Sequence, residues 1–309
     1  MPDTFQNYYS NPPTLWPRDY SRKYILDAKR CLTKNSHVFG IGSCFARNVS
    51  RWLARYGVAQ AIPNTVNHFN TSSIVYELSR ALGARLADVE WTSVSNGLTT
   101  YTDKMRHPFV ASSIDELNEL RNKYTHCVQQ GVRAYDIAVV TLGLSLVPRE
   151  QQPDGSIQTL NRLPPSNHQQ AFPFCMSFQS VSEITADLQH IVALLRFQVK
   201  APVIFTVSPV PLHGTITNND PRVDNMRSKS ALISAVHGLM DMKIPHVYYY
   251  PAYEMFQYSY GTEMQWQGDC RHPTAGAIDK VCRSFIDEYA IEPSEFADDV
   301  EPFSVPEAP

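Results

Sequence analysis

Short apolar runs alternate along the chain with segments in which apolar residues recur at helical spacing. The runs predict strands at residues 38–41, 136–142, 203–207 and 246–250. The spaced segments predict helices at residues 45–56, 114–130, 180–195, 226–242 and 273–286. Strands that alternate with helices favour an α/β fold, a three-layer α/β/α sandwich with a mainly parallel sheet.

Two of the predicted helices carry more detailed signals. The segment 114–130 ends near Gly131. Its apolar residues fall on one side of the predicted helix: Ile114, Leu117, Leu120, Tyr124 and Cys127. Ser180 and Glu183 have the spacing of a capping box, in which each side chain bonds the backbone amide of the other residue. The pattern therefore predicts a helix start at Ser180.

The alternating pattern covers residues 31–290, which we expect to form one domain. Residues 1–30, with prolines at positions 12, 13 and 17, are predicted to be an arm on that domain. Residues 144–180 interrupt the pattern with an Asp154-Gly155 turn between hairpin-like segments, and form either a lid, an acceptor-binding element or a structural excursion. The segment 291–309 is acidic and contains prolines, and we expect it to be a loosely attached tail.

A cysteine lies at the turn between the first predicted strand and the first helix, in the segment VFGIGSCFARNV at residues 38–49. Amides that open a helix lack intrahelical acceptors and carry the positive end of the helix dipole. A thiolate at Cys44 would be stabilised there, and the same amides can hold an oxyanion. The alternative is that Cys44 is a small residue packed behind the turn.

An acid and a histidine lie three residues apart near the other end of the chain. Asp269 and His272 come just before the predicted helix that opens at Pro273. An imidazole can take a proton from a nucleophile and return it to a leaving group, while a carboxylate holds the imidazole tautomer. Taken alone, this pair is also compatible with a helix cap or a surface position.

Together these segments resemble the GSCFA domain family, which carries the motif Gly42-Ser43-Cys44-Phe45-Ala46 in its name. The resemblance runs from about residue 37 to about residue 288. Its further blocks are Thr141–Leu144, Phe205–Pro211, Asn225–Ser230 and Asp269–His272. That family in turn resembles a branch of the SGNH/GDSL hydrolases, which implies a flavodoxin-like, SGNH hydrolase-like fold.

The GDSL pattern implies Cys44 as the nucleophile and Ser43 at the position of the aspartate. A thiol near a histidine ionises more readily than a serine hydroxyl, which favours the same choice over Ser43. The resemblance also implies that Asp269 and His272 supply the orienting acid and the base.

The oxyanion site is less complete, because Gly143-Leu144-Ser145 stands where SGNH hydrolases have Gly-x-Asn. The amide of Cys44 is the best candidate member. Ser145 can supply a hydroxyl, or an asparagine can fill the role; the candidates are Asn161, Asn64, Asn67 and Asn70. His213, with Asn218, Asn219, Arg222 and Arg227, lies in a segment after another strand and is a candidate contact for a substrate or an anionic group.

Composition narrows the class of protein. The formal net charge is −3 with no long basic run, which argues against a nucleic-acid partner. No apolar run approaches the ~20 residues that span a bilayer. Six cysteines without C-x-x-C spacing favour the reducing cytoplasm. Cys270 and His272 could be metal ligands, but no second pair has ligand spacing.

These observations lead to one expected function and two alternatives. We expect an esterase, acyl hydrolase or O-acyltransferase that acts on a carbohydrate or lipid-like ester through an acyl-cysteine intermediate. It should require no cofactor, with acyl-coenzyme A as a candidate acyl donor. The alternatives are a non-catalytic protein that binds a glycan or a partner, and a metal-dependent hydrolase.

Overall fold

Five parallel strands form the central sheet in the order β11-β10-β6-β1-β2. The computed structural model describes residues 24, 26, 28–63, 65–152, 154–164, 174–258, 265–297 and 302–305. The strands are β1 (His37–Gly42), β2 (Ala59–Gln60), β6 (Ile137–Leu142), β10 (Val203–Val207) and β11 (Val247–Tyr250). Counted along the sheet by chain order, they read 2-1-3-4-5, the flavodoxin-like order. The predicted parallel α/β fold is confirmed.

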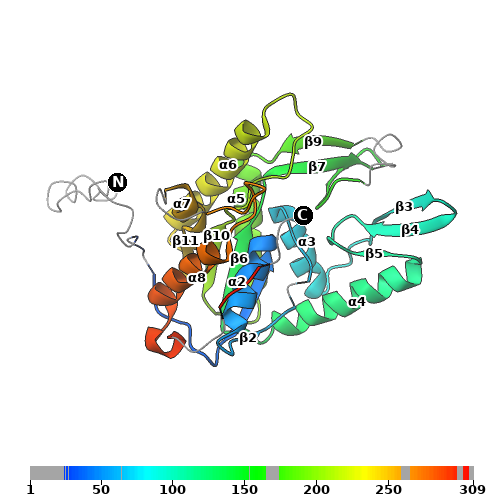
Figure 1. Ribbon diagram of the computed structural model, residues 1–309. Coiled ribbons are helices and arrows are strands. Elements are labelled where there is room, and N and C mark those ends of the chain that lie inside the picture. Colours follow the sequence, from blue (N-terminus) through cyan, green and yellow to red (C-terminus); the bar gives the residue numbers. More distant parts are fainter. Residues whose placement is uncertain are drawn as a thin grey trace.

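Helices cover both faces of this sheet (Figure 1). One face packs against α2 (Cys44–Ala54), α7 (Ala252–Gln257) and α8 (Ala275–Tyr289). The other packs against α3 (Thr71–Ala81), α4 (Ile114–Gly131), α5 (Val181–Leu195) and α6 (Pro221–Asp241). Within β1, Val38 packs in the core on the side of α2 and α8, whereas Phe39 and Ile41 pack in the core on the side of α3 to α6. Burial on both sides explains why the inner strands β1, β6 and β10 are largely apolar runs.

Several predicted boundaries need correction. The capping box of α5 is confirmed, but α6 begins at Pro221, five residues before the predicted start, because Asp220 caps it through the Arg222 amide. Helix α8 begins at Ala275 and not at Pro273, because the Thr274 side chain accepts a hydrogen bond from the Ala277 amide.

The buried side of α4 also differs from the predicted stripe. It contains Leu117 and Tyr124, as predicted, together with Arg121 and Val128, whereas Ile114 is exposed. Arg121 is buried because its Nε donates to Asp103 Oδ2 at 2.6 Å. An ion pair between Arg121 and Asp103 thus occupies a position on the buried side of α4 where helical spacing alone predicts an apolar residue.

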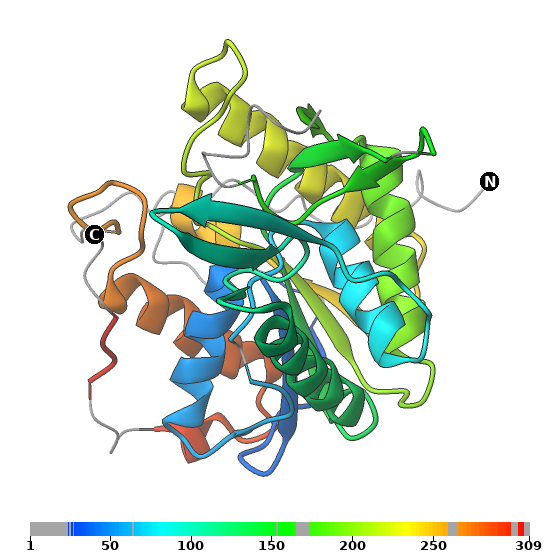
Figure 2. The same cartoon turned by 90° about the vertical axis from the view of Figure 1, so that its right-hand side faces the viewer.

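Two small antiparallel sheets extend from one end of the core (Figures 1 and 2). The first consists of β3 (Glu90–Ser95), β4 (Leu98–Asp103) and β5 (Val110–Ala111), and no sequence pattern predicted it. The second consists of β7 (Leu146–Gln151), β8 (Ile157–Thr159) and β9 (Phe174–Phe178). The predicted hairpin at Asp154-Gly155 joins β7 to β8. Residues 165–173 of the predicted insertion lie outside the described residues.

The described part of the C-terminal tail packs on the domain, which corrects the expected loose attachment. A 3₁₀ turn at Pro293–Phe296 places Phe296, which is 3% exposed, in the core beside α2 and α8. Phe303 and Val305 also pack against that core. Most of the predicted N-terminal arm lies outside the described residues.

Gly42 fixes the turn from β1 into α2. Its φ is +135°, a value that residues with a side chain rarely adopt. A Cβ at this position would lie 2.0 Å from the Thr141 carbonyl oxygen on β6. The Ser43 amide donates to that same carbonyl at 3.0 Å. Only glycine allows β1 and β6 to approach this closely where the chain turns.

Replacing Gly42 should therefore destabilise the domain far more than replacing another glycine with a positive φ. We expect Gly42→Ala to lower the free energy of unfolding by at least about 3 kcal/mol, because backbone strain and a steric clash add. Gly57→Ala is the control: φ is +80°, but the added Cβ meets open space, so about 1 kcal/mol is expected. Urea unfolding of both variants measures this, and equal losses would contradict the close-approach argument.

Candidate functional site

A cavity of about 380 Å³ lies at the carboxyl ends of β1, β6 and β10. Its floor is formed by residues that follow these strands: Ser43, Cys44, Gly143, Leu144, Ser208 and Val210. The small sheet of β7, β8 and β9, here called the second accessory sheet, also lines the cavity, with Leu146, Pro148 and Met176 among its residues. The strand order reverses at β1 and β6, and open α/β sheets bind ligands at such a switch point. The volume is in the range of small-molecule sites.

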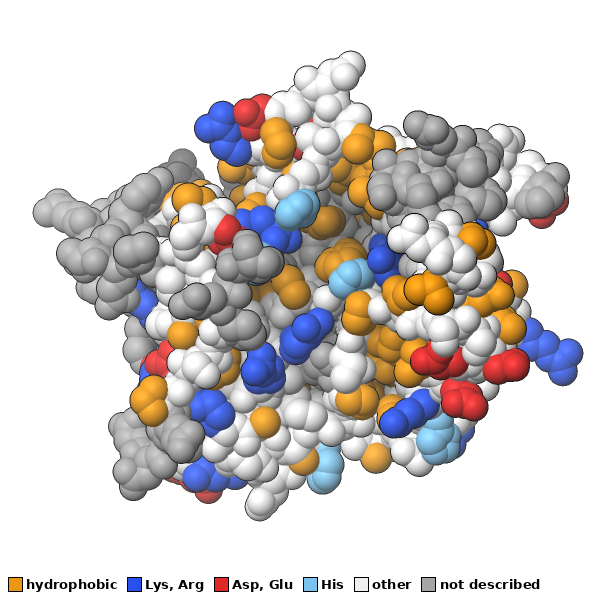
Figure 3. Space-filling view, turned by 45° about the vertical axis from the view of Figure 1, so that its right-hand side comes forward, with side chains coloured by type: hydrophobic (Ala, Val, Ile, Leu, Met, Phe, Trp, Pro, Cys, Tyr) orange, Lys and Arg blue, Asp and Glu red, His pale blue; other side chains and the backbone are white. Residues whose placement is uncertain are grey.

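Hydrophobic side chains predominate in the cavity wall. Figure 3 shows a face of the molecule that is hollowed near its centre, with hydrophobic side chains exposed there and Lys or Arg side chains beside them. The charged residues that line the cavity are Arg162 and Arg271. None of the described lining residues is Asp or Glu.

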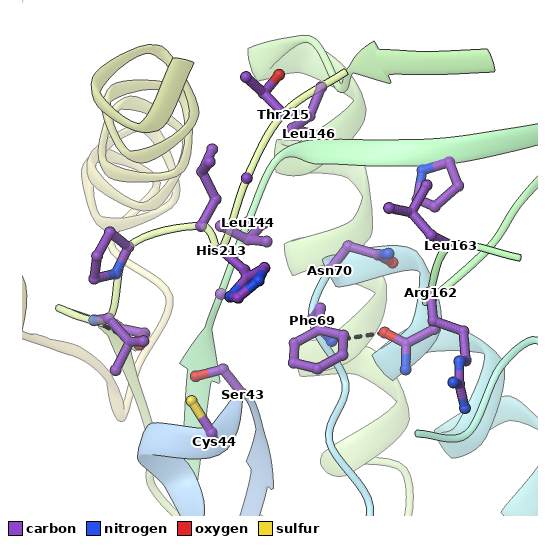
Figure 4. A pocket seen from close by; sticks show the side chains of 18 of the residues that line it. Ser43, Cys44, Phe69, Asn70, Leu144, Leu146, Arg162, Leu163, His213 and Thr215 are labelled. Atoms are coloured by element: carbon purple, nitrogen blue, oxygen red, sulfur yellow. Dashed lines mark hydrogen bonds between the residues drawn. The ribbon is translucent and has the colours of Figure 1, made fainter. Parts of the chain in front are cut away.

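Ser43 and Cys44 point into this cavity from the start of α2 (Figure 4). Cys44 is the first residue of the helix, and Ser43 is its N-cap. The Ser43 hydroxyl makes no capping hydrogen bond, and although Ser43 is only 4% exposed, its Oγ has no partner among the described residues. A buried hydroxyl without a partner is rare and is available to hydrogen-bond a ligand.

The Cys44 thiol is not ionised by its position at the helix start, contrary to the expectation from sequence. Burial raises the pKa of Cys44 above its ordinary value, and this effect outweighs the opposing charges of Lys229, Arg271 and Arg47. The thiol is therefore protonated at neutral pH in the ligand-free protein, and attack on a carbonyl requires a group that takes its proton.

Lys229 is the cation with the largest effect on this thiol. It lies on α6 and is 0% exposed, and its Nζ donates to the carbonyl oxygens of Gly143 and Ser208, each at 2.7 Å. These carbonyls end β6 and β10 at the cavity floor. Burial lowers the pKa of Lys229 to about 7, and the charge of Cys44 opposes this change.

Asp269 and His272 form the predicted pair, with Asp269 Oδ2 2.5 Å from His272 Nδ1. Asp269 also accepts hydrogen bonds from the backbone amides of His272 and Arg271. These bonds lower the pKa of Asp269 to about 2, so the carboxylate stays charged. The pair lies partly in solvent, with the His272 side chain 33% exposed.

Arg271 connects this pair to the cavity. Its Nη1 lies 3.1 Å from His272 Nε2, and its Nε donates to the Pro211 carbonyl oxygen. Because a guanidinium is only a donor, His272 Nε2 must be the acceptor and Nδ1 must carry the proton. This tautomer suits a general base, but its lone pair faces Arg271. In the described part of the chain, no hydrogen bond joins Cys44 to His272 or to Lys229.

The two predicted asparagines in the cavity wall have structural partners. The Asn70 side chain caps α3 through the Ser73 amide and donates to the Leu160 carbonyl. The Asn161 side chain accepts from the Phe69 amide at 2.6 Å and donates to the Asn67 carbonyl. Both amides hold the loop beside Cys44 and so position the cavity wall.

The other predicted site residues divide in the same way. His213 and Gly143 line the cavity, and a Cβ on Gly143 would meet the Phe69 carbonyl oxygen at 2.5 Å. Ser145 is fully buried and does not line the cavity, because its amide and hydroxyl bond Ser228; its proposed role as an oxyanion donor is wrong for this arrangement. Asn64 lies outside the described residues.

The arginines that the sequence suggested for an anionic group have other partners. Arg222 pairs with Asp220 in solvent, and the Arg227 guanidinium lies 4.0 Å from the centre of the Phe178 ring. Sequence reasoning missed Arg162, Arg271 and the role of Lys229. Lys229 did lie in a motif block of the family resemblance, and Arg271 lies between Asp269 and His272.

A metal site has little support in these residues. Among the described residues, no group of three or more His, Cys, Asp or Glu side chains is arranged to hold a metal ion. His272 Nδ1 is bound to Asp269.

No helix in the described ranges is long and apolar enough to cross a membrane.

The site thus belongs to an α/β protein with a strand-turn-helix that presents Ser43 and Cys44 at a topological switch point. The model of the GSCFA family matches residues 37–285, and the chain belongs to that family. Comparison of the chain with curated proteins and with solved structures found no match.

The effect of Lys229 on Cys44 can be measured without knowing the substrate. Below about pH 7 the ammonium form predominates and favours the Cys44 thiolate. We expect Lys229→Met to slow iodoacetamide alkylation of Cys44 about tenfold near pH 6.5, the equivalent of about one pKa unit. The difference should shrink as the pH rises through 7 and the wild-type lysine loses its charge. Mass spectrometry of the Cys44 peptide gives the rates.

Lys123→Met, which removes an exposed lysine on α4, is the matched control and should leave the profile unchanged. Circular dichroism checks folding, because the Gly143 and Ser208 carbonyls lose their partner in Lys229→Met. Superimposable wild-type and Lys229→Met profiles would contradict the electrostatic coupling.

Proposed function

We propose that this protein is an acyl-transfer enzyme in which Cys44 forms a covalent acyl-thioester. The observation that carries the proposal is the meeting of a thiol and an unpartnered serine hydroxyl at a helix start, inside a mainly apolar cavity. The thiol supplies the nucleophile. The Ser43 hydroxyl and the amides at the start of α2 supply donors for the oxyanion. The likeness of the family motifs to SGNH hydrolases supports the same reaction class.

The first half of the reaction acylates Cys44. Arg271 moves away from His272 Nε2, which then takes the thiol proton while Asp269 holds Nδ1–H. The sulfur attacks the carbonyl carbon of an ester or thioester and forms an S–C bond, and the carbonyl oxygen gains the negative charge. When the intermediate collapses, the bond to the leaving group breaks and His272 returns the proton to that group.

In the second half, an acceptor attacks the acyl-thioester and His272 takes its proton. The S–C bond breaks and releases the product, and His272 returns the proton to the sulfur, which regenerates the Cys44 thiol. Water as acceptor makes the protein a hydrolase, whereas a hydroxyl or an amine makes it an acyltransferase. Thioesters react readily with such nucleophiles, so transfer suits a cysteine. The substrates are carbohydrate or lipid-like esters or thioesters, with acyl-coenzyme A as a candidate donor, and the reaction takes place in the cytoplasm.

Lys229 assists both halves as a positioning residue. Its ammonium form stabilises the thiolate from the side of the cavity floor, and its two hydrogen bonds fix the ends of β6 and β10. It does not touch the substrate in this mechanism. The energetic benefit comes from placing a positive charge near the developing negative charge in a site of low polarity.

One observation favours a second candidate function, a non-catalytic protein that binds a glycan or a partner in the cavity. In the described structure the His272 lone pair faces Arg271 and not Cys44. Catalytic hydrogen bonds are often absent before substrate binds, so acyl transfer still accounts for more of the site than binding does.

Intact-protein mass after brief incubation with 4-nitrophenyl butanoate or butanoyl-coenzyme A distinguishes the two functions. We expect one butanoyl adduct on the wild-type protein and none on Cys44→Ala. His272→Ala should slow adduct formation by a factor of about 10² or more, because it removes the proton acceptor. Cys175→Ala, which removes an exposed cysteine on β9, is the control and should keep the adduct. An absence of adducts with both donors would favour the binding protein.

A further inference from the structure

Arg162 is a cation in the cavity wall, and no carboxylate among the described residues forms an ion pair with it. It follows β8 and is half-buried. Among the described residues it makes no hydrogen bond and no ion pair, and its Nη1 is buried without a partner. The two arginines that are buried among the described residues differ: Arg106 pairs with Glu77, and Arg121 pairs with Asp103.

The surroundings of Arg162 do not neutralise it. Asp103 is the carboxylate whose charge reaches the guanidinium, but its oxygens already accept from Arg121 and from two backbone amides. Burial lowers the pKa of His107, and the charges of Arg162 and Arg47 lower it further, so both cationic groups lie near this histidine. Arg47 Nε is likewise buried without a partner.

This arrangement is energetically unfavourable for the empty protein. Removing a guanidinium from water without a compensating anion costs free energy. Burial accordingly lowers the pKa of Arg162, although an arginine keeps its charge at any physiological pH. A ligand anion would offset the cost, and a carboxylate fits the forked donors of a guanidinium.

The position of Arg162 relative to Cys44 indicates which part of a substrate it would meet. Figure 4 shows Ser43 and Cys44 on one side of the cavity and Arg162 with Leu163 on the other, with Phe69 between them. The leaving group must lie near His272, which protonates it, and that histidine is partly in solvent. The acyl group therefore extends across the cavity, over its apolar wall, toward Arg162.

We propose that the cavity accepts an acyl group with a negatively charged far end, as in a dicarboxylic half-ester or half-thioester, whose free carboxylate pairs with Arg162. This inference rests on the proposed acyl transfer to Cys44 and adds its substrate class. The ion pair forms at the end of the acyl chain remote from the reacting carbonyl. Arg162 is thus a specificity-determining residue.

A matched pair of esters tests the inference. Mono(4-nitrophenyl) glutarate and 4-nitrophenyl pentanoate have acyl chains of equal length that differ in the terminal carboxylate. We expect the wild-type protein to acylate Cys44 at least about tenfold faster with the glutarate, measured by intact mass. In Arg162→Met the ratio of the two rates should fall to about one. Arg149→Met is the control: it removes an arginine of β7 that pairs with Glu183, and it should keep the wild-type ratio.

The outcomes separate this inference from the proposed reaction. Equal rates with the two esters, or a preference that Arg162→Met retains, would overturn the inference and leave acyl transfer standing. If neither ester labels Cys44, the proposed reaction fails, and calorimetric titration of Cys44→Ala with glutarate becomes the test of the anion site. Binding that Arg162→Met weakens at least tenfold would support the site, whereas the same affinity in both proteins, or no binding, would overturn it.

Discussion

The geometry of the site depends on the buried Lys229 side chain. Its Nζ joins the carbonyl groups that end β6 and β10, and these two strand ends form the cavity floor. A buried ammonium is costly, and two carbonyl acceptors with a nearby thiol reduce that cost. The same contacts place a positive charge within reach of Cys44. One interaction therefore holds the floor together and acts on the ionisation of the nucleophile.

Two opposing electrostatic effects then define the chemistry. Burial disfavours the Cys44 thiolate, while Lys229, Arg271 and Arg47 favour it. The resting thiol is protonated, which protects it from unspecific reactions, and it reacts only when a base takes its proton. Arg271 contributes in a second way, because it holds the His272 lone pair until a substrate competes for its guanidinium. Substrate binding and activation of the base are thereby linked in the proposed mechanism.

Sequence patterns predicted four strands of the central sheet and five of its helices, because these strands are largely apolar and these helices have an apolar side. They missed the two-residue strand β2 and the helices α3 and α7. The hairpin of β3 and β4 was missed, because its strands are largely polar and pack on buried ion pairs such as Arg121 with Asp103. The prediction placed Cys44 at a helix start correctly. It did not predict the raised pKa, because the burial of a thiol depends on the second accessory sheet and the loops around it. Contacts of Lys229 and Arg162 depend on residues far apart in sequence, which no local spacing reveals.

A crystal structure of the protein after acylation by a slowly hydrolysed ester would test the central claim most directly. The account predicts an S–C bond at Cys44, a carbonyl oxygen within hydrogen-bond distance of the Ser43 hydroxyl or an amide at the start of α2, and an acyl chain that lies in the cavity. It also predicts that Arg271 has left His272 Nε2. An adduct confined to an exposed cysteine such as Cys175 or Cys270, with Cys44 unmodified and the cavity empty, would contradict it.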